Sequence, residues 1–79
     1  MRNINAVLGE FFRSKRISES LTGIEVAKKM SVSQQQISRY ERGVCSLSIE
    51  TILRYCEVLD ISPKELMVTL FPSEKIIFE

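Results

Sequence analysis

A helix start signal that occurs four times limits what this chain can fold into. Each copy begins with an apolar residue that a Ser or Thr follows directly. The third residue after this Ser or Thr is variable, and the fourth is again apolar. The hydroxyl accepts a free N–H of a first helical turn, and the apolar pair packs across that turn. In three copies a Glu or Gln at the third position has the spacing of a capping box, which returns the bond. The copies are Leu21-Thr22…Glu25-Val26, Val32-Ser33…Gln36-Ile37, Leu47-Ser48…Thr51-Ile52 and Ile61-Ser62…Glu65-Leu66.

The periodicity of the chain predicts five helices and no sheet. An apolar stripe that begins at Ile4 indicates a first helix of about 12 residues. The other four are expected over residues 23–30, 34–42, 49–59 and 63–71, with Gly43 ending the third and Pro72 the fifth. The gap between the second and third is short enough for helix-turn-helix geometry. We therefore expect a compact all-α, five-helix domain over residues 1–71 and a C-terminal tail, 72–79, that takes part in dimerisation.

Composition excludes several functions. The chain has 79 residues, no histidine and two cysteines, which are too few ligands for an ordinary zinc site. Histidine is also the commonest general base, so we expect no enzyme, no catalytic residue, no metal and no cofactor. No apolar run approaches the roughly 18 residues of a membrane span, and no secretory leader opens the chain. A cytoplasmic protein with no membrane contact is therefore expected.

The net charge of +1 conceals an uneven distribution. Residues 13–42 contain seven basic and three acidic side chains, whereas residues 43–79 contain three basic and six acidic ones. A basic first half indicates a surface that faces a polyanion. Chance clustering on a solvated surface is the alternative.

The expected helix over residues 34–42 has two different sides. Ile37, Tyr40 and Glu41 fall on the side that faces inward. The opposite side carries amide, hydroxyl and guanidinium groups and no acid, a set able to hydrogen-bond base edges in a major groove. Gln36 stays open, because its amide has the position to turn back to its own cap. A solvated polar face is the plainer alternative for the outer set, which is Gln34, Gln35, Ser38, Arg39 and Arg42.

These residues carry a family resemblance that extends over about residues 4–70. Its signature is Leu21-Thr22…Val26-Ala27…Met30…Val32-Ser33-Gln34-Gln35…Ile37-Ser38-Arg39-Tyr40-Glu41-Arg42-Gly43, followed by Ser48-Ile49-Glu50-Thr51-Ile52 and Ile61-Ser62…Glu65-Leu66. The pattern resembles the lambdoid phage repressor and Cro-type helix-turn-helix family, which includes the xenobiotic-response-element type of bacterial regulators. Within that family, residues 34–40 are more weakly similar to small regulators of fimbrial operons in enteric bacteria.

The resemblance implies a five-helix domain that binds operator DNA as a homodimer. Arg16 and Glu41 match a structural pair that ties the first helix to the reading helix. The positions that match DNA contacts are Gln34, Gln35, Ser38 and Arg39 for base reading, and Thr22, Gly23 and Arg42 for phosphates.

Three features depart from the family. Gly23 stands where many members have a glutamine that grips a phosphate, which leaves a backbone N–H for that contact. Ser31 stands where glycine is frequent, so we expect a left-handed, strained residue. The loop over residues 44–47 has no basic side chain, so we expect fewer phosphate contacts and a shallower salt dependence.

The second half of the chain has an apolar surplus. On the helix over residues 49–59 we expect a core stripe of Ile49, Ile52, Leu53, Cys56 and Leu59. Cys56 is interpreted as a small buried hydrophobe and Cys45 as an accessible loop residue, with no disulfide between them. The surplus predicts a twofold homodimer interface made up of Tyr55, Val58, Met67, Phe71, Ile76, Ile77 and Phe78. The tail either pairs as a short strand across the axis or lies in a groove; the plainer alternative is that all these residues serve one chain's core.

Two interpretations of function follow. The first is a sequence-specific transcriptional regulator that binds double-stranded DNA as a homodimer, with helix 34–42 in the major groove. The alternative is a helix-turn-helix scaffold used as a protein-interaction module or antitoxin-like partner, which the low net charge, the bare loop and the apolar surplus favour. In neither case is a small-molecule ligand expected.

Overall fold

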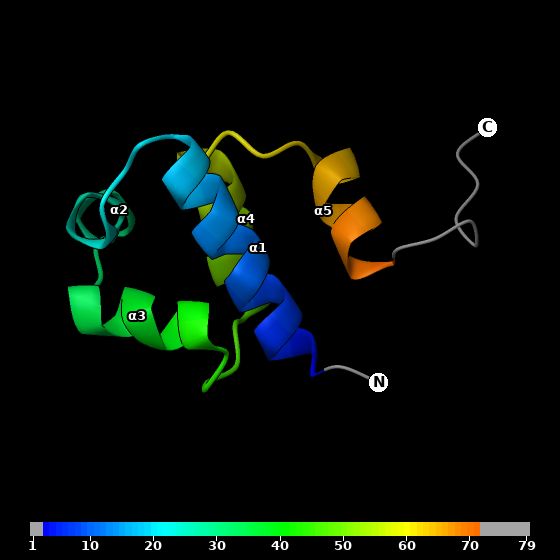
Figure 1. Cartoon of the computed structure of the whole chain (residues 1–79), viewed down its shortest axis with the longest axis horizontal. Coiled ribbons are helices and arrows are strands. Elements are labelled where there is room, and N and C mark those ends of the chain that lie inside the picture. Colours follow the sequence, from blue (N-terminus) through cyan, green and yellow to red (C-terminus); the bar gives the residue numbers. More distant parts are fainter. Residues whose placement is uncertain (1–2, 72–79) are drawn as a thin grey trace.

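The computed structural model describes residues 3–71 as a bundle of helices (Figure 1). α2 and α3 lie together on one side of α1, and α5 lies on the other side. α1 packs against α3 and α5, while α2 packs against α3 and α4. No strand occurs within residues 3–71, so the predicted all-α class is confirmed. The helices are α1 (Ile4–Ser18), α2 (Gly23–Met30), α3 (Gln34–Arg42), α4 (Ile49–Val58) and α5 (Pro63–Leu70).

Each helix begins after a polar residue whose side-chain oxygen accepts a backbone N–H of the first turn. The four predicted caps each accept the N–H three residues later at 3.1 Å. At the start of α1 an asparagine side chain accepts the N–H two residues later, at 2.7 Å. These bonds satisfy donors that have no partner inside the helix, which is why the starts were predictable from the sequence. The caps are Asn3, Thr22, Ser33, Ser48 and Ser62.

Of the three predicted capping boxes, the one in α2 forms. Glu25 accepts the backbone N–H of its own cap at 2.8 Å, which lowers the pKa of this carboxyl group. The box at Glu65 was predicted and does not form, and the one at Gln36, which the sequence left open, does not form either, because each side chain finds a partner elsewhere in the fold. The amide of Gln36 donates to Sγ of Cys45 at 3.6 Å, and Glu65 accepts from Nζ of Lys15 at 2.6 Å.

The predicted helix bounds hold for α2 and α3 and shift elsewhere. α1 has 15 residues and continues to Ser18. Its last turn contains Lys15 and Arg16, whose positive charges interact favourably with the negative end of the helix dipole. α4 and α5 each end one residue earlier than predicted. Leu59 and Phe71 are their C-caps, and the backbone angles of these two residues are no longer helical.

Residues with left-handed backbone angles follow α1, α2, α3 and α4, where the chain turns toward the next helix. Gly43 closes α3 with φ of 71°, as predicted, and Ser31 closes α2 with φ of 58°, also as predicted. Ser20 and Asp60 are left-handed as well, at φ of 59° and 55°, although neither is glycine. Ser and Asp tolerate this region better than bulky residues, but nothing in their sequence context predicted it.

The core is centred on an aromatic stack rather than on the predicted stripe of α4. Tyr55 is fully buried, and its ring stacks on Phe12 with centroids 4.1 Å apart, while Tyr40 meets it edge-on at 6.0 Å. Ile49 and Leu53, which were expected in the core, are 73% and 60% exposed. The prediction was wrong for these two residues, whereas the other three members of the predicted α4 stripe do face the core. An alternative stripe turned by about one residue buries the large tyrosine ring, which removes more apolar area from water.

This burial also corrects one predicted dimer contact. Tyr55 has no exposed surface in the chain, so it is not available to a second subunit. Its burial raises the pKa of the phenol. The buried core is completed by Leu8, Val26, Ala27, Met30, Ile37, Leu59 and Ile61, with Ile52, Cys56 and Val58 packed against it.

α1 lies directly on the backbone of α3 at Gly9. A Cβ at this position would stand 2.4 Å from the carbonyl oxygen of Tyr40 and 2.7 Å from that of Glu41. Gly43 is similarly close to the first turn of α1, where a Cβ would stand 2.7 Å from Cα of Ala6. The two glycines therefore let the backbone of α3 approach that of α1 more closely than side chains would allow, which sets the distance between these two helices.

We expect Tyr55→Phe to leave stability unchanged or to raise it by about 1 kcal/mol, since its hydroxyl has no hydrogen-bond partner among residues 3–71. Phe12→Ala, which removes the stacked ring, should cost about 3–5 kcal/mol. Urea unfolding followed by circular dichroism measures both. A loss above about 1 kcal/mol for Tyr55→Phe would mean that the hydroxyl is bonded in the folded protein.

Candidate nucleic-acid interface

The turn between α2 and α3 holds the two helices at a large angle (Figure 1). It consists of Ser31, Val32 and the α3 cap Ser33. The N–H of Ser31 donates to the carbonyl of Lys28, and the N–H of Val32 donates to that of Ala27. These bonds end α2 in a left-handed turn that leaves one long side of α3 free of the bundle.

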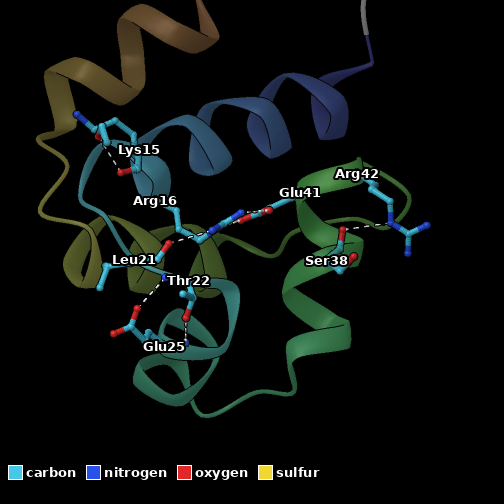
Figure 2. A network of polar contacts seen from close by, with 9 residues as sticks. Lys15, Arg16, Leu21, Thr22, Glu25, Ser38, Glu41 and Arg42 are labelled. Carbon is cyan, nitrogen blue, oxygen red and sulfur yellow. Dashed lines mark hydrogen bonds and ion pairs between the residues drawn. The ribbon is translucent and has the colours of Figure 1, made fainter.

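The five polar side chains predicted for the outer side of α3 are all exposed. On the inner side Ile37 is 1% exposed, and the carboxylate of Glu41 is held at the α1 boundary. No acidic residue stands on the outer side within α3. Arg42 lies back along the helix, with Nε donating to the carbonyl of Ser38 at 3.4 Å (Figure 2). The outer side is Gln34, Gln35, Ser38, Arg39 and Arg42, which we call the α3 outer face.

Gln36 does not belong to that face. It is half-buried, and its amide reaches the loop after α3 through Cys45. The sequence left its direction open, and no local signal pointed to the cysteine nine residues later. The run of three glutamines is thus divided, with two exposed side chains and one that fastens α3 to its own following loop.

A polar hollow of about 190 Å³ lies between the start of α2 and the first turns of α3. Gly23 borders it, and a Cβ on this glycine would meet nothing nearer than Cγ of Gln34 at 3.8 Å. The hydroxyl oxygen of Thr22 caps α2 by accepting the N–H of Glu25. The start of α2, whose first N–H groups lack a partner within the helix, therefore borders a space lined by Arg16, Gly23, Gln34, Ile37, Ser38 and Glu41.

Arg16 connects α1 to both helices of the interface (Figure 2). Its Nε donates to Oε2 of Glu41 at 2.6 Å, and its Nη2 to Oε1 of the same carboxylate at 3.1 Å. Its Nη1 donates to the carbonyl of Leu21 at 2.9 Å, just before the cap of α2. The two charged side chains keep 15% and 10% of their surface exposed, and the bond to Glu41 raises the pKa of Arg16.

A second ion pair of equal length differs in its surroundings. Nζ of Lys15 lies 2.6 Å from Oε2 of Glu65, which joins α1 to α5. Here 25% and 45% of the side-chain surfaces are exposed, and the pair is joined by a single hydrogen bond. The bond raises the pKa of Lys15 and lowers that of Glu65. Water screens such a pair, so it contributes little to stability.

The residues predicted for dimerisation fall into four groups. Met67 and Phe71 on α5 and its C-cap are 39% and 53% exposed, whereas Val58 is half-buried against the core. Tyr55 lies inside the core. The tail residues Ile76, Ile77 and Phe78 lie outside the described residues. On α4 and α5, sequence reasoning missed three further exposed apolar side chains, Ile49, Leu53 and Val68, the first two because they were assigned to the core stripe of α4.

Residues 3–71 contain neither a cluster of metal-ligating side chains nor a helix that could span a bilayer. No group of three or more His, Cys, Asp or Glu side chains in this part of the chain is placed to hold a metal ion. No helix within it is long and apolar enough to cross a bilayer. Cys45 and Cys56 are both free and half-buried, and burial raises the pKa of the Cys56 thiol.

We expect Arg16→Met to lower the free energy of unfolding by about 1.5–3 kcal/mol, because it leaves a largely buried carboxylate without its charged partner. The matched control is Lys15→Met on the neighbouring residue, which breaks an exposed pair of the same length and should change stability little. Equal losses in urea unfolding for the two variants would mean that burial does not distinguish the two ion pairs.

Comparisons with known proteins agree with this geometry. A helix-turn-helix family model matches residues 12–66. Antitoxin PezA of Streptococcus pneumoniae serotype 4 (strain ATCC BAA-334 / TIGR4) is 34% identical over 56 residues, which are 71% of this chain and 35% of the antitoxin. The chain therefore spans about a third of the length of that relative.

Among solved structures, the clp gene regulator ClgR from C. glutamicum aligns with a TM-score of 0.84 at 26% identity. The alignment covers 98% of this chain and 100% of that chain. Because the family model covers well over half of the sequence and both helices of the interface, this chain belongs to the Cro/C1-type helix-turn-helix family.

Proposed function

We propose that the chain is a DNA-binding transcriptional regulator that recognises specific double-stranded sequences with α3 in the major groove. The observation that carries this proposal is the α3 outer face, whose five exposed side chains include no acid and are held at a fixed height on α1. Membership of the helix-turn-helix family and the likeness to a gene regulator support it. We propose no catalytic role, metal or cofactor.

Base reading is assigned to the first two turns of α3. Gln34 and Gln35 present amides that pair with adenine N6 and N7, and Arg39 presents a guanidinium that pairs with guanine O6 and N7. Ser38 stands between them as a shorter, auxiliary donor or acceptor. The N-terminal end of a recognition helix is the part that points at base edges, which is where these residues are concentrated.

Phosphate contacts are assigned to both ends of the interface. At one end, the polar hollow beside Gly23 suits a phosphate oxygen, since the first N–H groups of α2 and its dipole favour an anion there. The neighbouring Thr22 contributes by capping this helix start. At the other end Arg42 reaches a phosphate after it releases the carbonyl of Ser38.

We propose that the chain binds as a homodimer through its second half, with residues 1–71 as the DNA-binding domain and 72–79 as a dimerising tail. The exposed apolar side chains of Met67 and Phe71 support this, as do those of Ile49 and Leu53 on α4. Two copies would then present α3 to successive major grooves, with half-sites about 34 Å apart.

A second candidate is a helix-turn-helix scaffold that binds another protein, as an antitoxin does. One relative is an antitoxin, and the exposed apolar side chains of α4 and α5 are suited to a protein partner. The uncommitted outer face of α3 has no use in this alternative, so we place it second.

Selection of bound sequences from a random DNA pool near 150 mM salt tests the proposal. We expect enrichment of an inverted repeat with about 10 base pairs between half-site centres. Enrichment of a single half-site would retain the DNA-binding role and overturn the dimer. Folded protein that enriches no sequence would contradict sequence-specific binding and favour the protein-partner alternative.

We expect alanine substitutions of the two arginines on α3 to weaken DNA binding in different ways. Arg39→Ala should cost about 1–3 kcal/mol of binding to the selected sequence and relax the preference at one base pair. Arg42→Ala should weaken binding to all sequences alike and reduce the slope of log affinity against log salt by about 1. Titrations of selected and random DNA at several salt concentrations measure both effects. Equal losses on both DNAs for Arg39→Ala would contradict its base-reading role.

A further inference from the structure

The turn of the helix-turn-helix is held by few bonds of its own. Ser31 is left-handed at φ of 58° and ψ of 41°, a region that L side chains rarely adopt. Its N–H and that of Val32 return to carbonyls of α2 at 3.2 and 3.0 Å. Those carbonyls belong to Lys28 and Ala27, so the bonds leave the last carbonyl of α2 for another donor.

That donor comes from α4. Nη1 of Arg54 lies 3.2 Å from the carbonyl oxygen of Met30, the last residue of α2. Met30 is 1% exposed and belongs to the buried core, and its carbonyl directly precedes the turn. Carbonyls at a helix C-terminus lack a partner within the helix and attract positive charge. The guanidinium of Arg54 therefore supplies both a hydrogen-bond donor and a positive charge to the C-terminal end of α2.

Packing beneath the turn is incomplete. A small cavity of about 50 Å³ lies between the end of α2, the turn, α3 and α4. The side chains of Arg54 and Thr51 line it from α4, and Val32 lines it from the turn. This hollow borders the turn, so the bond from Arg54 to Met30 joins α4 to the end of α2 beside incompletely filled space.

We propose that Arg54 is a positioning residue for DNA recognition, which sets the angle of α3 by anchoring the α2–α3 turn to α4. It acts through the carbonyl of Met30 and touches no base or phosphate. The inference rests on the proposed DNA-binding function, because the angle of α3 matters only for a surface that is read. It adds a second anchor, on α4, to the one that Arg16 provides from α1.

The first experiment measures binding of four proteins to the selected sequence and to random DNA at several salt concentrations. They are the wild type, Arg54→Met, Arg54→Lys and the charge control Lys64→Met on α5, compared at equal oligomeric state. We expect Arg54→Met to weaken specific binding about fivefold to tenfold and random-DNA binding less than about twofold. Its salt slope should equal that of the wild type, Arg54→Lys should restore part of the specific affinity, and Lys64→Met should match the wild type.

The second experiment does not depend on DNA. Hydrogen exchange of the free proteins should be about tenfold faster at the amides of Ser31 and Val32 in Arg54→Met, with amides of α5 unchanged. Because these amides form the turn, the measurement tests the anchor even if the wild type binds no specific sequence.

Distinct outcomes overturn the inference. Unchanged exchange at the turn, or unchanged specific affinity in Arg54→Met, would remove the positioning role. A salt slope reduced by about 1 would identify Arg54 as a direct phosphate contact. Proportional losses on both DNAs with faster exchange throughout would mean that Arg54 serves only general stability. A wild type that enriches no sequence, with faster exchange at the turn in the variant, would retain the anchor and overturn the proposed function.

Discussion

The ion pair between Arg16 and Glu41 is the contact on which the rest of the interface depends. One guanidinium on α1 holds a carboxylate on α3 by two bonds and a carbonyl in the loop before α2 by a third. The position of α3 is therefore set from α1 and not only through the turn that follows α2. On the same boundary, Gly9 brings the two backbones into contact, so that α3 cannot rise or tilt without breaking the pair.

A small domain achieves this precision by separating support from recognition. α1 and α4 contribute the stacked rings of Phe12 and Tyr55, and the apolar side of α3 closes over them with Ile37. Because these contacts and the bonds of Glu41 and Gln36 leave the opposite side of α3 unused, its outer face stays free for polar side chains that make few bonds within the chain. The contrast between Arg16 and Lys15 follows the same logic. Both pairs are 2.6 Å long, but only the one next to the interface is largely shielded from water.

Most of the helices and of the outer face could be predicted because their signals are local. A capping hydroxyl, a staple and a closing glycine lie within one turn of the bond that they make, which explains the correct bounds of α2 and α3. The α3 outer face follows from helical periodicity once those bounds are known. Whether each of its residues contacts DNA stays a prediction.

The failures concern choices that distant residues decide. Two stripes of α4 share Ile52 and Cys56, and the ring of Phe12, far earlier in the chain, selects the one that contains Tyr55. Gln36 and Glu65 have the spacing of capping boxes, yet Cys45 and Lys15 lie within reach and take their side chains. The bond from Arg54 to Met30 likewise links positions 24 residues apart, so no local sequence window contains it.

Protection of the selected DNA from methylation by dimethyl sulfate tests most directly whether α3 reads the major groove. The reagent methylates guanine N7, which lies in the major groove, and adenine N3, which lies in the minor groove. Bound protein should protect guanine N7 within each half-site, and Arg39→Ala should abolish the protection at one guanine while the DNA remains occupied. Protection confined to adenine N3, or guanine N7 positions that stay reactive under saturating protein, would contradict recognition by α3.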